Sequence, residues 1–282
     1  MNRLEIIKSS GEKATFKTEK LIASLRKAGA SAELASNIAT EIQGSLFDGI
    51  TTKEIYKKAF SRLKRHSRPT AARYKLKKAI MELGETGYPF EKFVAALLAS
   101  EGYETQVGVI VQGHCVTHEV DVIAQNDKHH YMCECKFHNQ QGRHCNVKIP
   151  LYIQSRFKDV EKAWQKNQGH ETKFHQGWIF TNTRFSTDAM QYGKCIGLKL
   201  VSWDYPENDG IKDRVDRSGI HPVTCLTTLT SKEKNTLIEL DKILCMDLCN
   251  NPNLLQKIGV SKNRHQKILR EAFDLCHRTN SS

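Results

Sequence analysis

The sequence contains no long apolar run and no apolar leader. Its apolar stretches are shorter than the roughly 20 residues that a membrane-spanning helix needs, so we expect no membrane segment. The chain begins Met-Asn-Arg-Leu-Glu, which is unlike the apolar start of a signal peptide. The nine cysteines are odd in number and irregularly spaced, which argues against a disulfide framework. These absences predict a cytoplasmic protein with reduced thiols.

Positive charge is concentrated in the first 84 residues. This segment has 12 Lys and 6 Arg against 7 Glu and 1 Asp, a net charge of +10 out of +12 for the whole chain, so the remaining residues carry only +2. A basic module favours partners that bear phosphates, either nucleotides or nucleic acid. A solvated Lys-rich helical face would account for the same charge without any partner.

The length of 282 residues allows two or more domains, and residues 1–84 form the first of them. Residues 4–8 and 14–16 have the pattern of two short strands. Helical periodicity follows in four segments, with apolar positions in residues 21–28, 34–42, 55–63 and 72–83. Pro69 opens the last of these helices and Gly84 ends it. A two-stranded lid on a helical bundle is the expected shape.

Three motifs identify this segment further: Ile6-Ile7-Lys8-x-x-Gly11, Phe16-x-x-Glu19-Lys20-Leu21-Ile22 and Asp48-Gly49-Ile50-Thr51-Thr52-x-Glu54-Ile55. Over residues 3–83 the segment resembles the ATP-cone, a nucleotide-sensing module of ribonucleotide reductases and their repressor. The resemblance implies that ATP or dATP binds beneath the lid as a regulatory nucleotide. Lys8 and Lys20 would contact its phosphates, and Thr52 would lie near its base or ribose.

The lid departs from the family at one position. ATP-cones usually carry Lys-Arg there, whereas this chain has Lys8-Ser9. Loss of the Arg removes a bidentate phosphate contact that Lys cannot reproduce. The choice between ATP and dATP therefore stays open. The cone could also have lost nucleotide binding and serve in oligomerisation or DNA binding.

The second segment contains carboxylates and a lysine that are expected to converge. Asp121 lies in a strand-like stretch, and Glu134 and Lys136 lie in the next one, with a hairpin loop between them. Because alternate side chains of a strand share a face, Glu134 and Lys136 point to one side, and Asp121 on the neighbouring strand can reach it. Two carboxylates beside each other can hold a divalent metal. Glu91, on the helix before the strands, is a further candidate.

The elements of this segment follow the order α-β-β-β-α-β-α-β, which predicts an α/β domain with a mixed sheet flanked by helices. The helices are expected over residues 88–98, 152–164 and 187–192, and the strands over residues 107–111, 118–124, 131–137, 177–181 and 198–203.

Four short motifs of residues 86–205 occur in a characteristic order. They are Phe90-Glu91, Glu119-Val120-Asp121, Glu134-Cys135-Lys136 and Phe180-Thr181-Asn182-x-x-Phe185-Ser186-x-x-Ala189. They resemble the PD-(D/E)XK nuclease fold, specifically Mrr-like type IV restriction endonucleases. The resemblance implies a Mg²⁺-dependent endonuclease that cuts DNA in restriction or antiviral defence, with Glu91, Asp121, Glu134 and Lys136 catalytic. Asp121 and Glu134 would bind the metal. A homo-oligomer is expected, since cutting both strands takes two such sites.

Two alternatives remain open. The chain could be a non-catalytic regulator that senses ATP or dATP and binds nucleic acid. Residues 114–145 are also rich in His and Cys, so they could bind zinc. The spacing of Cys133 and Cys135 is too tight for a zinc knuckle, and buried strand cysteines are the favoured interpretation.

The end of the chain is expected to be a linker over residues 206–229 and a helical domain over residues 230–282. A helix beginning near Thr230 carries apolar residues from Leu237 to Leu248 on one face, and two short helices follow a break at residues 250–253. Such a tail could contact DNA phosphates, or it could serve in packing or dimerisation.

Overall fold

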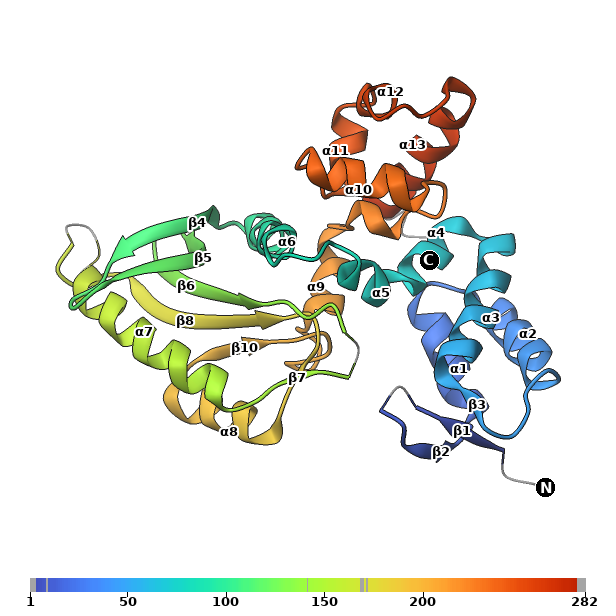
Figure 1. The fold of residues 1–282 in the computed structure, drawn as a ribbon, viewed down its shortest axis with the longest axis horizontal. Coiled ribbons are helices and arrows are strands. Elements are labelled where there is room, and N and C mark those ends of the chain that lie inside the picture. Colours follow the sequence, from blue (N-terminus) through green and yellow to red (C-terminus); the bar gives the residue numbers. More distant parts are fainter. Residues whose placement is uncertain (1–3, 9, 141, 168–169, 171, 278–282) are drawn as a thin grey trace.

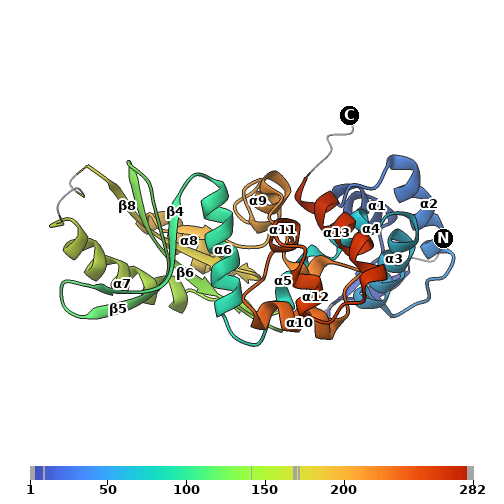
Figure 2. The same ribbon diagram turned by 90° about the horizontal axis from the view of Figure 1, so that it is seen from above.

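The computed structural model describes residues 4–8, 10–140, 142–167, 170 and 172–277, which fold into three parts (Figure 1). A five-stranded sheet with its helices lies at one end of the molecule, and the cone lies at the other. The last helices of the chain lie beside the cone, as Figure 2 shows from above. None of the described helices combines the length and the apolar character needed to cross a membrane.

The cone has the predicted lid and helices. The antiparallel strands β1 (Glu5–Ile7) and β2 (Lys13–Thr15) form the lid, and the short strand β3 (Ile50–Thr51), which was not predicted, pairs parallel with β1. The predicted last helix is divided at Lys75 into two shorter helices. The helices are α1 (Thr18–Lys27), α2 (Ala32–Gln43), α3 (Thr52–His66), α4 (Arg68–Tyr74) and α5 (Leu76–Met81).

The central part is the expected mixed α/β structure. Its strands are β4 (Glu104–Gln112), β5 (Thr117–Gln125), β6 (His129–Lys136), β8 (Phe174–Thr181) and β10 (Lys199–Val201). The sheet order is β10-β8-β6-β5-β4, in which β6, β8 and β10 run parallel and β4 and β5 run antiparallel to their neighbours. Two short strands that were not predicted, β7 (His144–Cys145) and β9 (Arg184–Phe185), pair outside this sheet.

Helices cover both faces of the sheet. Helix α6 (Tyr88–Ser100) lies on one face, and α7 (Lys148–Trp164) and α8 (Thr187–Ile196) lie on the other (Figure 1). Cys133 and Cys135 of β6 pack in the core shared with α6, whereas Met132 packs with α7. The period of two along β6 therefore separates its side chains between the two faces, as the sequence predicts.

Residues 206–229, which we expected to be a linker, are folded. They contain helix α9 (Ile211–Ser218) and the 3-10 helix η1 (Val223–Cys225). Apolar side chains of both are buried in the same core as α6. We expected a linker because this stretch is polar, but several of its charged residues form an ion-pair network. The buried Arg214 guanidinium donates to Glu101 Oε2 at 2.6 Å and to Asp209 Oδ2 at 2.7 Å. Charges that neutralise one another in this way can be buried with the helix that carries them.

The last part is helical, but its first helix is shorter than predicted. Helix α10 ends at Glu239, and Asp241 adopts a positive φ of 62° before α11 begins. The apolar residues expected on one long helix are therefore divided between two. The helices are α10 (Ser231–Glu239), α11 (Cys245–Asn250), α12 (Leu254–Lys257) and α13 (Lys262–Cys276).

One core joins the three parts. Buried side chains of α5, α6, the α6 face of the sheet, α9 and the C-terminal helices form a continuous apolar cluster. Polar contacts reinforce this connection: Thr224 Oγ1 donates to Ala79 O at 2.7 Å, and Arg73 Nη2 donates to Asp274 O at 3.0 Å. The end of the cone is thus packed against both the central α/β part and the C-terminal helices.

Ile211→Ala tests whether α9 is part of this core. The Ile211 side chain is 0% exposed, so its truncation is expected to lower the free energy of unfolding by about 2–5 kcal/mol. Ile110→Ala removes the same atoms from a side chain that is 75% exposed on β4, and it is expected to cost less than about 1 kcal/mol. Urea denaturation followed by circular dichroism measures both. Equally small losses for the two variants would contradict the packing of α9.

Candidate active site

Asp121 lies where β5 separates from β6. The pairing of these strands runs from Gln125 and His130 to Val122 and Cys133. Asp121 is the residue just before Val122 on β5. Its carboxylate Oδ2 accepts a hydrogen bond from the backbone N–H of Cys135 at 2.6 Å. The side chain thus bridges to the neighbouring strand at the point where the described pairing stops. This contact fixes one oxygen of Asp121 beside the end of β6.

Glu134 and Lys136 lie next to each other on the face of β6 that α7 covers. Glu134 is 3% exposed, and its Oε1 accepts a hydrogen bond from Lys136 Nζ at 2.5 Å. Burial disfavours the charged form of Lys136, but the hydrogen bond and the negative charge of Glu134 outweigh it and raise the lysine pKa. Glu134 and Lys136, which the spacing predicts to share a face, are therefore joined by an ion pair.

Arg156 of α7 completes this cluster and was not anticipated from the sequence. Its Nη1 donates to Glu134 Oε2 at 2.5 Å, and its Nη2 donates to the backbone oxygen of Glu119. Each oxygen of the buried Glu134 carboxylate therefore has a cationic partner. Arg156 comes 22 residues after Glu134, on a helix whose orientation no local motif specifies. Gln154 of the same helix was also unforeseen, and its Oε1 is buried without a hydrogen bond to any described residue.

Glu91 reaches the cluster from α6. Burial raises its pKa to about 7, and the charges of Asp121, Glu119 and Glu134 act in the same direction. Burial also raises the pKa of Asp121 to about 6, together with the charge of Glu134. The four expected residues Glu91, Asp121, Glu134 and Lys136 thus lie within electrostatic reach of one another. Their carboxylates repel one another, and nearby positive charge lowers the cost of keeping them ionised.

Of the three cone residues that we expect to contact a nucleotide, two lie at neighbouring positions and the third lies on a different element. Ile7 of β1 pairs with Thr51 of β3, which brings the following residues, Lys8 and Thr52, to neighbouring positions. Lys8 Nζ contacts Glu12 Oε2 at 2.9 Å across the lid. Lys20 is exposed in the first turn of α1, and no hydrogen bond among the described residues joins it to Lys8 or Thr52. Ser9, the position that departs from the family, lies outside the described residues.

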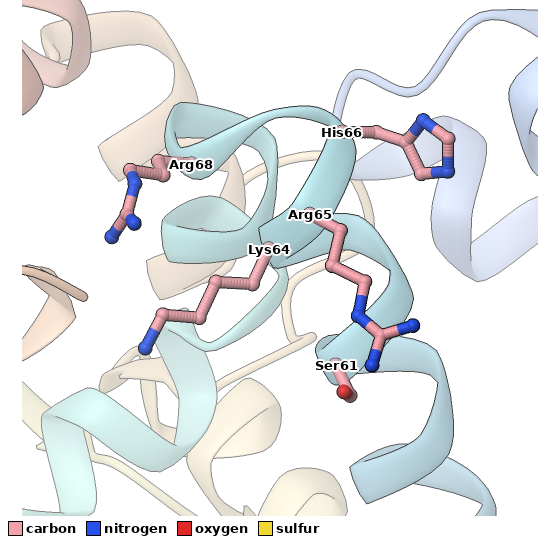
Figure 3. Close-up of a pocket in the computed structure, with 5 residues that line it drawn as sticks. All are labelled: Ser61, Lys64, Arg65, His66 and Arg68. Atoms are coloured by element: carbon pink, nitrogen blue, oxygen red, sulfur yellow. The ribbon is translucent and has the colours of Figure 1, made fainter.

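A basic cavity of about 500 Å³ lies at the end of α3 (Figure 3). Ser61, Lys64, Arg65, His66 and Arg68 line it. Figure 3 shows that the Lys64 and Arg65 side chains extend from the last turn of α3 and the Arg68 side chain from the start of α4. Such a concentration of cationic donors favours phosphate groups. The sequence indicated a basic first segment but not this location.

The cysteines expected to be buried are buried. Cys133 and Cys135 pack against α6, where burial raises the pKa of both thiols and so disfavours the thiolate that a metal binds. His138 Nε2 lies 3.4 Å from Cys145 Sγ. Among the residues that the structure describes, one group of His, Cys, Asp and Glu side chains has its ligand atoms close enough together to hold a metal ion. Only one member of that group, His130, comes from residues 114–145.

Arg156→Gln is expected to destabilise the protein by about 3–5 kcal/mol, because it leaves a buried carboxylate with a single cationic partner. Lys158→Gln on the same helix is the matched control. Lys158 Nζ contacts Glu161 at 2.7 Å with a side chain that is 59% exposed, so its loss is expected to cost less than about 1 kcal/mol. Thermal and urea denaturation measure the two. A neutral Arg156→Gln would contradict the role of this ion pair.

Comparison with known families places three matches along the chain. A model of the ATP cone domain matches residues 4–82, a model described as restriction endonuclease matches residues 83–205, and a model described as AF1548-like, C-terminal matches residues 221–276. The first part of the chain is therefore an ATP cone, and the middle part is a nuclease-type domain.

Similar proteins share the greater part of the chain. An uncharacterised protein of Archaeoglobus fulgidus is 38% identical over 180 residues, which are 64% of this chain and 97% of that protein. The crystal structure of the protein of unknown function AF1548 has a TM-score of 0.54 and 37% identity, and the match covers 68% of this chain and 98% of that one. The chain thus belongs to the family of these AF1548-like proteins with a restriction-endonuclease domain, and it carries an ATP cone before that domain.

Proposed function

We propose that this protein is a Mg²⁺-dependent endonuclease that hydrolyses phosphodiester bonds of DNA, under the control of ATP or dATP bound to its cone. The observation that carries the proposal is the convergence of Glu91, Asp121, Glu134 and Lys136 from three elements. A module that only binds DNA has no need for three mutually repelling carboxylates beside a lysine. The match of this domain to a restriction endonuclease family supports a role in restriction or defence.

The donor set fits a divalent metal. Hard carboxylate oxygens are the ligands that Mg²⁺ prefers, and Asp121 and Glu134 would hold it. Burial raises the pKa of Asp121 and of Glu91, and the neighbouring carboxylates raise it further; a bound ion would balance that negative charge. Carboxylate oxygens have more than one lone pair, so Glu134 can bind an ion and still accept from Lys136 or Arg156. When bound, the ion would supply positive charge beside the scissile phosphate.

The protein side chains would orient the reacting groups and stabilise the charge that develops during the reaction. Lys136, whose raised pKa keeps it protonated, would orient the attacking water and would offset charge that develops on the phosphate. Glu91 would position Lys136 or help to hold a second ion. Arg156 would act as a positioning residue, because its contacts with Glu134 and with the backbone of Glu119 hold the carboxylate at the end of β6.

The cone is joined closely enough to this site to influence it. Helix α5 of the cone ends at Met81, and α6, which carries Glu91, begins at Tyr88. Lys75 Nζ donates to Thr224 O at 3.0 Å and contacts Glu82 at 2.6 Å, so the end of the cone also holds η1. A nucleotide that changes the packing or assembly of the cone would therefore shift α6. The basic cavity at the end of α3 would add phosphate contacts for DNA.

Asp121→Ala and Lys136→Ala are each expected to slow nicking of supercoiled plasmid in Mg²⁺ by at least about 100-fold, the lower range for loss of a group that stabilises charge in the transition state. The initial rate of nicking on agarose gels measures the effect, with circular dichroism as the check on folding. Lys128→Ala is the control, since Lys128 is an exposed lysine in the turn of the same hairpin.

Undiminished cleavage by folded Asp121→Ala would refute the proposed site. A wild-type protein that binds DNA and nucleotide but never cuts would instead support the non-catalytic regulator.

Lys8→Ala and Lys20→Ala are expected to weaken ATP and dATP binding about 10- to 100-fold each, since a hydrogen bond from a charged group contributes about 1.5–3 kcal/mol. Isothermal titration calorimetry measures the affinity. Lys27→Ala is the control, because Lys27 is exposed in the last turn of the helix that begins near Lys20.

Plasmid nicking and light scattering, each with and without ATP or dATP, then test whether the cone controls cleavage. If nucleotide changes the oligomeric state but not cleavage, control of cleavage by the cone is wrong.

A further inference from the structure

Three histidines meet at the end of the sheet opposite to Glu134. His130 of β6 and His175 of β8 are direct partners in the parallel ladder, and His170 lies in the connection before β8. One ring nitrogen from each lies within 4.8 Å of the others. Their ring centroids are 4.7 Å apart for His130 and His170, 5.4 Å for His170 and His175, and 5.6 Å for His130 and His175.

Among the described residues, His130 and His175 each have a buried ring nitrogen without the hydrogen-bond partner that burial normally demands. His130 is 5% exposed and His175 is 9% exposed. Nδ1 of His130 and Nε2 of His175 are buried and make no hydrogen bond to any residue that the structure describes. An unsatisfied buried polar atom costs about 1–3 kcal/mol, so two of them side by side need a compensating ligand.

We propose that His130, His170 and His175 bind a divalent transition-metal ion, with Zn²⁺ as the preferred ion. Imidazole nitrogen is a ligand that suits Zn²⁺, and three histidines leave a fourth tetrahedral position for water. The site is independent of the proposed nuclease site, because it uses none of the same residues. His130 lies four positions before Glu134 on the same strand, which separates the two by about 13 Å.

The geometry is close to that of a zinc site. Zinc–nitrogen bonds of about 2.0–2.1 Å place the donor atoms of a tetrahedral site about 3.3 Å apart. The three donor atoms lie within 4.8 Å of one another, so rotation of the rings by small angles, with a small shift of His170, would bring them to this separation. His130 and His175 are held on adjacent central strands and provide the fixed part of the site.

The metal would anchor α7 to the sheet. Trp164, in the last turn of α7, lies against His130 with ring centroids 3.9 Å apart. The same helix is also held by Asp159, whose Oδ1 accepts a hydrogen bond from the backbone N–H of Cys115 at 2.8 Å and whose Oδ2 lies 2.8 Å from His118 Nε2. Arg156, which contacts Glu134, lies on this helix as well. A metal at the histidines would thus fix the C-terminal end of the helix that carries Arg156.

Metal analysis of the untagged full-length protein tests the proposal. After removal of bound metal with a chelator and reloading with one equivalent of ZnCl₂, gel-filtered wild-type protein is expected to retain about one zinc per chain and to melt at a higher temperature than the metal-free form. Cobalt substitution is expected to give the intense visible absorption of tetrahedral Co²⁺. His130→Gln and His175→Gln are each expected to weaken zinc binding by at least the roughly 10- to 100-fold that loss of an outer-shell partner costs.

Two controls separate this site from others. His129→Gln changes the neighbouring strand residue, whose ring packs against Tyr103 and Tyr131 rather than in the cluster, and it is expected to retain zinc. Asp121→Ala is also expected to retain zinc, whatever it does to cleavage. The proposal is overturned if the wild-type protein retains no zinc, if its cobalt spectrum is octahedral, or if Asp121→Ala loses the metal while His175→Gln keeps it. The wild-type measurements decide the matter even if a histidine variant fails to fold.

Discussion

The buried carboxylate of Glu134 is the constraint on which the nuclease-type domain depends. A charge that is 3% exposed is tolerable only when it is paired, and the two partners come from different directions. Lys136 lies on the same strand, and Arg156 comes from α7, which crosses the face of the sheet. The pairing therefore fixes the position of the helix as well as that of the side chains. Asp121 and Glu91 then surround this group with further negative charge, which suits the site to a cation rather than to mere packing.

The second constraint is the shared apolar core. The end of the cone, α6, α9 and the C-terminal helices bury their side chains in one cluster, so none of these elements can move alone at small cost. Glu91 lies on the helix at the centre of this arrangement. A nucleotide bound at the cone, whose candidate residues Lys8, Lys20 and Thr52 all lie far before Glu91 in the sequence, could act on the carboxylates through packing, without touching them. Of the three roles that the sequence allows for the C-terminal helices, which are DNA contact, packing and dimerisation, the structure shows packing.

The sequence predicts those features that depend on local periodicity. The alternation along β6 is enough to put Glu134 and Lys136 on one face and Cys133 and Cys135 on the other. The order of helices and strands is likewise local, and it gives the α/β class and the lid of the cone. The roles of Glu91, Asp121, Glu134 and Lys136 remain a proposal, although the structure brings these residues close together.

The features that could not be predicted depend on tertiary contacts. Arg156 looks like one more charge on an amphipathic helix until the crossing of α7 over β6 is known. Arg214 and its acidic partners made residues 206–229 look like a solvated linker, whereas mutual neutralisation lets α9 pack in the core. The histidine cluster combines His130 with His170 and His175 across a parallel crossover, so no spacing along the chain reveals it.

The most direct test of the account is a crystal structure of the full chain grown with Mn²⁺ in place of Mg²⁺, since anomalous scattering locates Mn²⁺ without assumptions about its ligands. The account predicts an ion bound between oxygens of Asp121 and Glu134 at about 2.1–2.2 Å, near the range for hard divalent ions. An ion bound elsewhere, with Glu134 still held only by Lys136 and Arg156, would contradict it.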